Sequence, residues 1–143
     1  MPLRHPKSLI ALFLTLCSLT VQAQSQTYYP VKELLSTGKT VVGEEVRYPT
    51  SGAPRITVSI VTVAPGADAA FHRHPAPLVA YILEGELTVD YGAKGTRVYR
   101  QGDALVEAMD VPHRGFNPGS ALVKLLAVYI GAEGTDNVVL EKP

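Results

Sequence analysis

The chain has 143 residues, enough for one ordinary domain. Its 13 basic and 13 acidic residues cancel, so the basic excess expected of a nucleic-acid or anionic-membrane partner is absent. A single cysteine excludes a disulfide framework within the chain.

Residues 1–23 have the pattern of a secretory signal peptide. Arg4 and Lys7 precede an apolar run at 9–19, and small residues lead up to Ala23 as at a cleavage site. The run is far shorter than the roughly 20 residues that span a bilayer. We therefore expect cleavage after Ala23, no membrane association afterwards, and a periplasmic or secreted protein. Loss of Arg4 and Lys7 leaves 11 basic against 13 acidic residues, a formal charge of −2.

Residues 24–54 form an N-terminal extension that glycine and proline divide into short pieces. Within it, residues 31–35 are expected to form one helical turn and residues 41–48 an edge strand.

From residue 55 the pattern becomes that of β structure. Residues 55–63 are rich in β-branched side chains and alternate apolar with polar. Short strands with glycine or proline at nearly every joint, and no convincing amphipathic helix, predict an all-β sandwich or barrel over residues 55–132, followed by a tail at 133–143. The further strands are expected at 78–83, 87–91, 96–100, 104–108 and 121–130.

Three histidines remain after signal cleavage, and they fall in two short segments. His72 and His74 are two residues apart, so on an extended segment their side chains point to the same face. Two such imidazoles can converge on one metal ion. The third donor would be His113, the one other histidine of the mature chain.

These residues lie in two motifs that resemble those of the cupin superfamily, specifically a small single-domain cupin. In the first motif Gly66 is followed after five residues by His72-Arg73-His74, and Gly85 ends the motif in register. The position that usually holds glutamate holds Leu78 instead.

In the second motif Gly102, His113 and Asn117 are in register, while Ala108 and Asp110 replace the usual proline and glycine. The resemblance covers roughly residues 55–130.

The resemblance implies a double-stranded β-helix, the cupin jelly-roll barrel, with one divalent metal ion held by His72, His74 and His113. Zinc, copper, iron, manganese and nickel are all open as the ion. The family's carboxylate role does not carry over, because Leu78 has no donor atom. Three neutral imidazoles leave the site charge at +2 and keep a coordination position open for water or substrate.

Several other residues are candidates for the site. Glu107 lies on a strand that enters the barrel, where it would bind the ion, orient a ligand histidine, or instead face solvent or an arginine. Strand alternation predicts that Arg73 and Arg114 point away from the neighbouring histidines. Pocket residues for an apolar ligand, with plain barrel packing as the alternative, are Phe71, Leu78, Tyr81 and Phe116.

The sequence leaves the function between two main classes, both with a small organic molecule as partner and no nucleic acid. In the first, the protein is a metal-dependent enzyme, for example a dioxygenase, a hydrolase or an isomerase. In the second, the site captures a small ligand for binding or sensing without turnover. A homodimer formed through the apolar segment 122–130 is a further option.

Overall fold

The computed structural model describes residues 29–141. The predicted signal peptide at 1–23 therefore lies outside the described residues. The chain divides into two units, and every strand belongs to the one formed by residues 32–143. Among the described residues, none of the helical structure is long and apolar enough to cross a lipid bilayer.

The regular secondary structure of the described residues is almost entirely β. Its elements, in chain order, are β1 (Pro54–Val63), β2 (His72–Arg73), β3 (Leu78–Glu84), β4 (Glu86–Asp90), the 3₁₀ turn η1 (Gly92–Lys94), β5 (Thr96–Arg100), β6 (Ala104–Val106), β7 (Arg114–Phe116), β8 (Val123–Ala132) and β9 (Val139–Leu140). The all-β prediction is confirmed.

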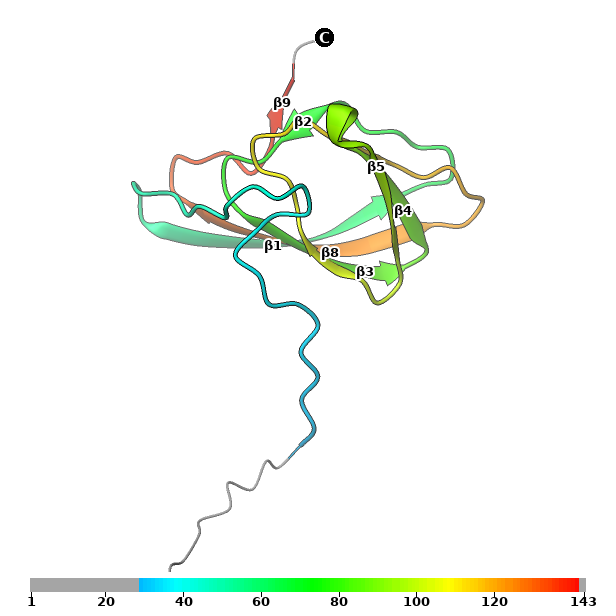
Figure 1. Cartoon of the computed structure of the whole chain (residues 1–143), viewed down its shortest axis with the longest axis horizontal. Helices are drawn as coiled ribbons and strands as arrows, with labels where there is room; N and C mark the ends of the chain where they lie inside the picture. The colour runs from blue at the N-terminus through cyan, green and yellow to red at the C-terminus, as the bar shows by residue number, and fades with distance from the viewer. Residues whose placement is uncertain (1–28, 142–143) are drawn as a thin grey trace, which may run out of the picture. The chain divides into compact units, whose positions relative to one another are not determined.

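The strands form three antiparallel sheets. One has four strands in the order β1-β8-β3-β6, a second has three in the order β5-β4-β7, and β2 pairs with β9. The four-stranded sheet runs along one side of the barrel, β4 and β5 form another side, and β2 and β9 lie together near one end (Figure 1).

Alternation along the strands builds the core between the sheets. In β8 the odd-numbered residues Val123, Leu125 and Ala127 are buried, and in β3 the even-numbered residues Ala80 and Ile82 are buried. Side chains with period 2 in a strand point to one face, so these residues meet Leu87, Val89 and Tyr91 from the opposite sheet. This packing fixes the strands that carry the two histidine motifs.

Gly85 joins β3 to β4 in a conformation that another residue would not tolerate. Its φ is +80°, and a Cβ there would lie 2.5 Å from the carbonyl oxygen of Leu122. Glycine is therefore required at the end of the first motif by backbone geometry and by close approach.

Two expected elements of the N-terminal extension do not form. Residues 31–35 contain no helical turn, and residues 41–48 contain no strand beyond a single bridge between Lys39 and Glu45. Gly43, at φ +90°, turns the chain back so that Thr40 N–H donates to Glu44 O at 2.8 Å. Because these residues form a tight turn, they cannot form the extended strand that was expected there.

The expected tail at 133–143 is also more ordered than its sequence indicates. Within it, Val139 and Leu140 form β9 and pair with Arg73 and His72. The end of the chain therefore supports the segment that carries the first histidine pair.

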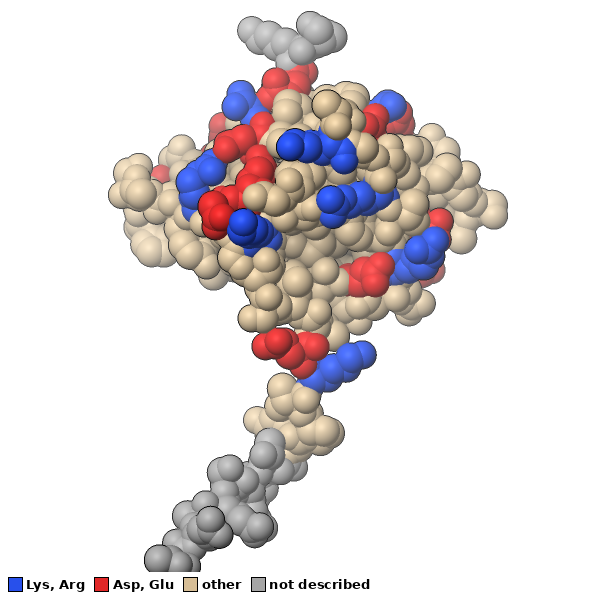
Figure 2. Space-filling model, viewed as in Figure 1, with Lys and Arg blue, Asp and Glu red and all other residues tan. Residues whose placement is uncertain are grey.

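Charged side chains on the surface lie mostly in small groups of mixed sign. Figure 2 shows this for one face of the molecule, and exposed ion pairs such as Arg100 with Glu86 and Lys124 with Glu84 are examples. Exposed pairs of this kind contribute at most about 1 kcal/mol each, so the fold is held chiefly by its core.

Candidate metal centre

Backbone pairing brings the two histidine motifs together. The N–H of His72 donates to the carbonyl of His113 at 2.9 Å, and the N–H of His113 donates to the carbonyl of His72 at 2.9 Å. Residues that exchange both hydrogen bonds lie directly opposite each other and present their side chains on the same face. The two imidazoles are therefore neighbours although 41 positions separate them in the sequence.

His74 lies beside these two imidazoles because it is two residues beyond His72 and because hydrogen bonds hold both its backbone and its ring. Its backbone N–H donates to the carbonyl of Met109 at 3.1 Å, and its Nδ1 lies 2.7 Å from the carbonyl oxygen of Asn137. His74 is 2% exposed. The loop before His113 and the C-terminal segment thus fix the third ring.

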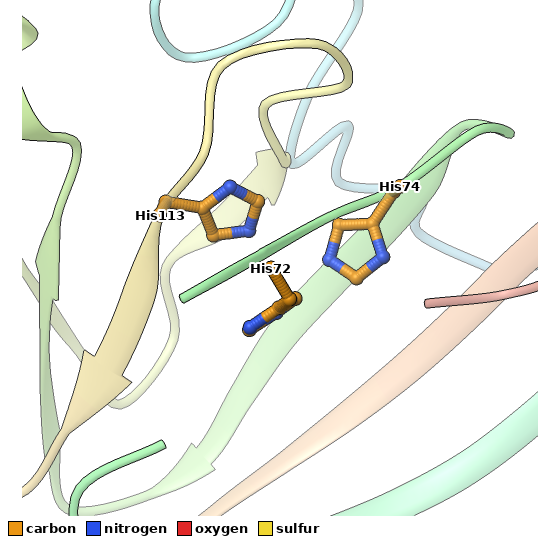
Figure 3. A group of neighbouring side chains, drawn as sticks. All are labelled: His72, His74 and His113. Carbon is orange, nitrogen blue, oxygen red and sulfur yellow. The ribbon is translucent and has the colours of Figure 1, made fainter. Parts of the chain in front are cut away.

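The three rings face a common centre, as Figure 3 shows. Their centroids are 4.7–5.1 Å apart, and one nitrogen from each ring lies within 4.8 Å of the others. Opposite ligands of a metal bound at 2.0–2.1 Å are separated by about 4 Å, so ring movements of less than about 1 Å would bring these three donor atoms onto one ion.

Each ring is also held in the tautomer that metal binding needs. The Nδ1 atoms lie 2.7–2.9 Å from the backbone carbonyls of Ala70, Asn137 and Val111. A carbonyl only accepts, so each Nδ1 carries the hydrogen and the neutral ring keeps its lone pair on Nε2. Nε2 of His113 is buried and has no hydrogen-bond partner in the part of the chain that the structure describes. A buried lone pair with no donor is costly unless an ion or water satisfies it.

Burial favours the neutral imidazole at His72 and His74. Desolvation lowers the pKa of His72, and it lowers the pKa of His74 to about 4, with the neighbouring histidines adding to the effect. Both shifts favour the unprotonated form that binds a metal.

We expect the metal-free protein to lose stability as the pH falls below about 6.5. In that range the unfolded chain protonates His74 while the folded chain does not until about pH 4, so the free energy of unfolding falls as pH falls. Over this window His74 accounts for roughly 3 kcal/mol. Urea unfolding at several pH values, compared with His74→Asn, measures it. Equal pH slopes for the two proteins would contradict the prediction.

Glu107 points into the same space. It is 7% exposed, and its Oε1 lies 4.0 Å from Nε2 of His113. Tyr91 Oη donates to that oxygen at 2.7 Å and Ala108 N–H donates to it at 2.8 Å. Tyr91 Oη is in turn 3.0 Å from Tyr99 Oη. Glu107 therefore neither faces solvent nor pairs with an arginine; it is a buried carboxylate beside the histidines.

A cavity of about 130 Å³ opens in front of the histidines. Apart from the three histidines, Glu107 and Tyr129, its wall is apolar, and it contains no lysine or arginine. Leu78, 6% exposed, forms part of this wall. The other residues that line it are Val61, Val63, Ala69, Leu87, Val89, Gly115, Leu125 and Tyr129.

The structure places three pocket candidates outside this cavity. Tyr81 lies on β3 one position out of phase with the buried Ala80 and Ile82, so it points to the other face of the sheet. The rings of Phe71 and Phe116 instead lie against the guanidinium of Arg114, at 5.2 and 5.7 Å. That guanidinium also pairs with Asp68 at 2.6 Å, and Arg114 is directed away from the cavity, as alternation predicts.

Glu44 supports the centre from the N-terminal extension, and the sequence analysis missed it. Its carboxylate accepts the backbone N–H groups of Met109, Asp110 and Val111 at 2.7–2.9 Å, and the hydroxyl of Thr40 at 3.0 Å. This is the loop whose carbonyls hold the rings of His113 and the backbone of His74. No spacing rule connects residue 44 with residue 110; only the fold does.

Glu44→Gln is expected to destabilise the protein by about 2 kcal/mol and to weaken metal binding about tenfold. An amide replaces one acceptor oxygen by a donor, so backbone N–H groups of the loop lose their partner. The matched control is Glu45→Gln, since Glu45 is exposed and pairs with Lys39 alone. Denaturant unfolding and metal titration measure both variants. If Glu45→Gln has the same effect as Glu44→Gln, the loop contacts are not responsible.

Comparison with known proteins supports the fold and the motifs. The chain matches the family model of the cupin domain over residues 59–129. It is similar to the DMSP lyase DddQ from Ruegeria pomeroyi DSS-3, with a TM-score of 0.54 and 25% identity, over 62% of this chain and 44% of that one.

It is also similar to an oxalate oxidase, with a TM-score of 0.51 and 25% identity, over 59% of this chain and 45% of that one. An uncharacterised protein with a double-stranded β-helix domain from Klebsiella pneumoniae gives a TM-score of 0.53 and 20% identity, over 68% and 91% of the two chains. The chain spans less than half of the two enzymes. No curated protein matches it.

Proposed function

Because the chain belongs to the cupin superfamily, and because its three converging imidazoles are aligned as donors, we propose that it is an exported metal-dependent enzyme acting on a small organic molecule. The observation that carries the proposal is the set of three Nδ1–H to carbonyl contacts, which leave every Nε2 lone pair free for one ion. A bound divalent ion would supply Lewis acidity and an open coordination position.

The cavity favours a small, largely uncharged substrate with one oxygen donor for the metal. Its volume of about 130 Å³ is well below the roughly 300–1,000 Å³ of drug-sized pockets. The absence of lysine and arginine from its lining leaves a dicarboxylate no cation other than the metal. The apolar wall around Leu78 would pack against the carbon skeleton, and this packing also excludes water.

Glu107 is the residue proposed to act beside the metal. Both of its hydrogen bonds end on Oε1, so Oε2 has no donor among residues 29–141. A carboxylate here lowers the site charge from +2 to +1, as the glutamate missing at position 78 would have done. Tyr91 and Ala108 hold it in place, so it is oriented before substrate arrives.

The expected export bears on which metal is bound. A protein that folds after export takes its ion from the periplasm, and nitrogen donors bind copper and zinc more tightly than iron or manganese. We therefore propose zinc or copper over iron and manganese. Metal analysis of protein isolated from the native periplasm tests this, and finding iron or manganese would overturn it.

The function itself is tested with protein loaded separately with each of the five metals. Oxygen uptake and product formation are followed over a panel of short neutral alcohols, ketones and esters, with oxalate as the charged comparison. We expect turnover with at least one metal and a preference for neutral substrates. Glu107→Gln should lower kcat while metal content stays near one per chain. Tight ligand binding without turnover would instead identify the protein as a binding or sensing module.

A further inference from the structure

The outer face of the four-stranded sheet is apolar and exposed. On β1, Ile56, Val58 and Ile60 are 64%, 61% and 57% exposed. The strand register places Val58 opposite Val128, and Val128 opposite Val79. Residues opposite each other share a face. The outer face is thus formed by Ile56, Val58, Ile60, Val79, Tyr81, Leu126, Val128 and Ile130.

None of these eight residues is charged, and charge appears only at one end of the face. There Lys124 pairs with Glu84 at 2.8 Å. Apolar patches of more than a few hundred Å² are uncommon on monomeric soluble proteins. A face this apolar, on a sheet whose inner side already packs the core, needs a separate explanation.

The size of the outer face suits a protein partner. The three strands that form it, β1, β8 and β3, contain 10, 10 and 7 residues. At about 3.4 Å per residue and about 4.8 Å between strands, they cover about 440 Å² in projection. Because the side chains project unevenly from the sheet, the accessible surface of the face is larger than this projected area. Stable interfaces bury about 600–1,000 Å² on each partner, so the outer face supplies most of one such surface.

The free edge of β1 adds to the same surface. Among the described residues β1 pairs with β8 alone, so one edge of its 10 residues has no strand beside it. Apart from Pro54 and Arg55 at its start, the strand has none of the prolines or charges that usually protect an exposed edge. An uncovered edge next to an apolar face favours association.

We propose that the partner is a second copy of this chain, packed outer face to outer face about a two-fold axis. In such a dimer the same surface of both copies forms the interface. A charged face would therefore place like charges against each other, whereas an uncharged face can pack against its own copy without repulsion. The inference does not depend on the metal, because the cavity lies on the inner side of the same sheet.

The experiment is sedimentation velocity of the purified full chain over a concentration series, with Val58→Glu as the disrupting variant. Val58 lies midway along β1 and is 61% exposed, so a face-to-face dimer would bury an unpaired carboxylate there and its dissociation constant should rise at least 100-fold. The matched control is Val98→Glu, an exposed valine on β5 in the other sheet, which should leave the dimer intact.

Circular dichroism checks that Val58→Glu keeps its β structure, and Ile60→Thr replaces it if the glutamate prevents folding. The Ile60→Thr chain should dissociate at least tenfold more readily. Several results overturn the proposal: a wild-type chain that stays monomeric up to about 100 μM, a dimer that survives both substitutions, or a dimer that Val98→Glu dissociates. A monomer in which residues before 32 protect the outer face from hydrogen exchange would identify the chain's own N-terminal segment as the cover.

Discussion

Replacing His113 by alanine is expected to reduce the bound metal from about one ion per chain to less than a tenth of that at micromolar concentrations. The substitution removes one of three nitrogen donors and leaves a two-nitrogen site. The Nε2 of His113 is buried and has no hydrogen-bond partner among residues 29–141, so the substitution removes a nitrogen that makes no other contact of this kind there. Elemental analysis after gel filtration measures the effect.

The control for this prediction is Tyr129→Phe. Tyr129 also lines the cavity, and its ring lies 5.8 Å from that of His74, but the substitution leaves all three histidine donors in place. The control should keep its metal. If His113→Ala fails to fold, His72→Ala serves in its place, because His72 is only half-buried. Full metal content in a folded His72 or His113 variant would exclude the three-histidine centre.

The sequence predicted the centre because strand periodicity and motif order are local properties. Two histidines at positions i and i+2 share a face on any extended segment. The pairing of His72 with His113 followed from the order of two motifs that the cupin fold places side by side. Family, fold class and the main strands of the barrel were predicted for the same reason, and the structure and the comparisons confirm them.

What the sequence did not predict are contacts between distant segments. Glu44 and Asn137 hold the histidine loops from opposite ends of the chain, and neither belongs to a motif. Phe71 and Phe116 were candidates for the pocket, with barrel packing as the alternative, and in the structure both rings pack on Arg114. Hydrophobicity alone does not tell a cavity wall from a cation–π contact, since both bury an aromatic ring.

In the fold, position 78 and Glu107 lie side by side, so the residue at one bears on the residue at the other. The N–H of Glu107 donates to the carbonyl of Leu78 at 2.9 Å, so the two residues are neighbours across β3 and the end of β6. The family's glutamate position has become apolar, and a carboxylate enters the cavity from the adjacent strand instead. A carboxylate at position 78 and the carboxylate of Glu107 would repel each other in a buried site without a metal. The chain therefore carries one of them.

Leu78→Glu tests this relation, and its effects should be large and opposite in the two states of the protein. Without metal, a second buried carboxylate beside Glu107 should destabilise the fold by roughly 3–5 kcal/mol. With metal, the added oxygen donor should tighten binding at least tenfold, most for manganese, which prefers oxygen ligands. The gap between the melting temperatures of the metal-free and metal-loaded forms should therefore widen, and calorimetry and metal titration measure both changes.

The matched control is Leu78→Gln, which has nearly the same shape as the glutamate variant without its charge. It should destabilise the metal-free protein less than Leu78→Glu and should bind metal about as well as the wild type. Adding Glu107→Gln to Leu78→Glu should restore most of the lost stability, because it removes the repulsion between the two carboxylates. If Leu78→Glu binds metal no more tightly than Leu78→Gln, then the side chain at position 78 does not reach the ion, and the apolar wall does not occupy a vacant ligand position.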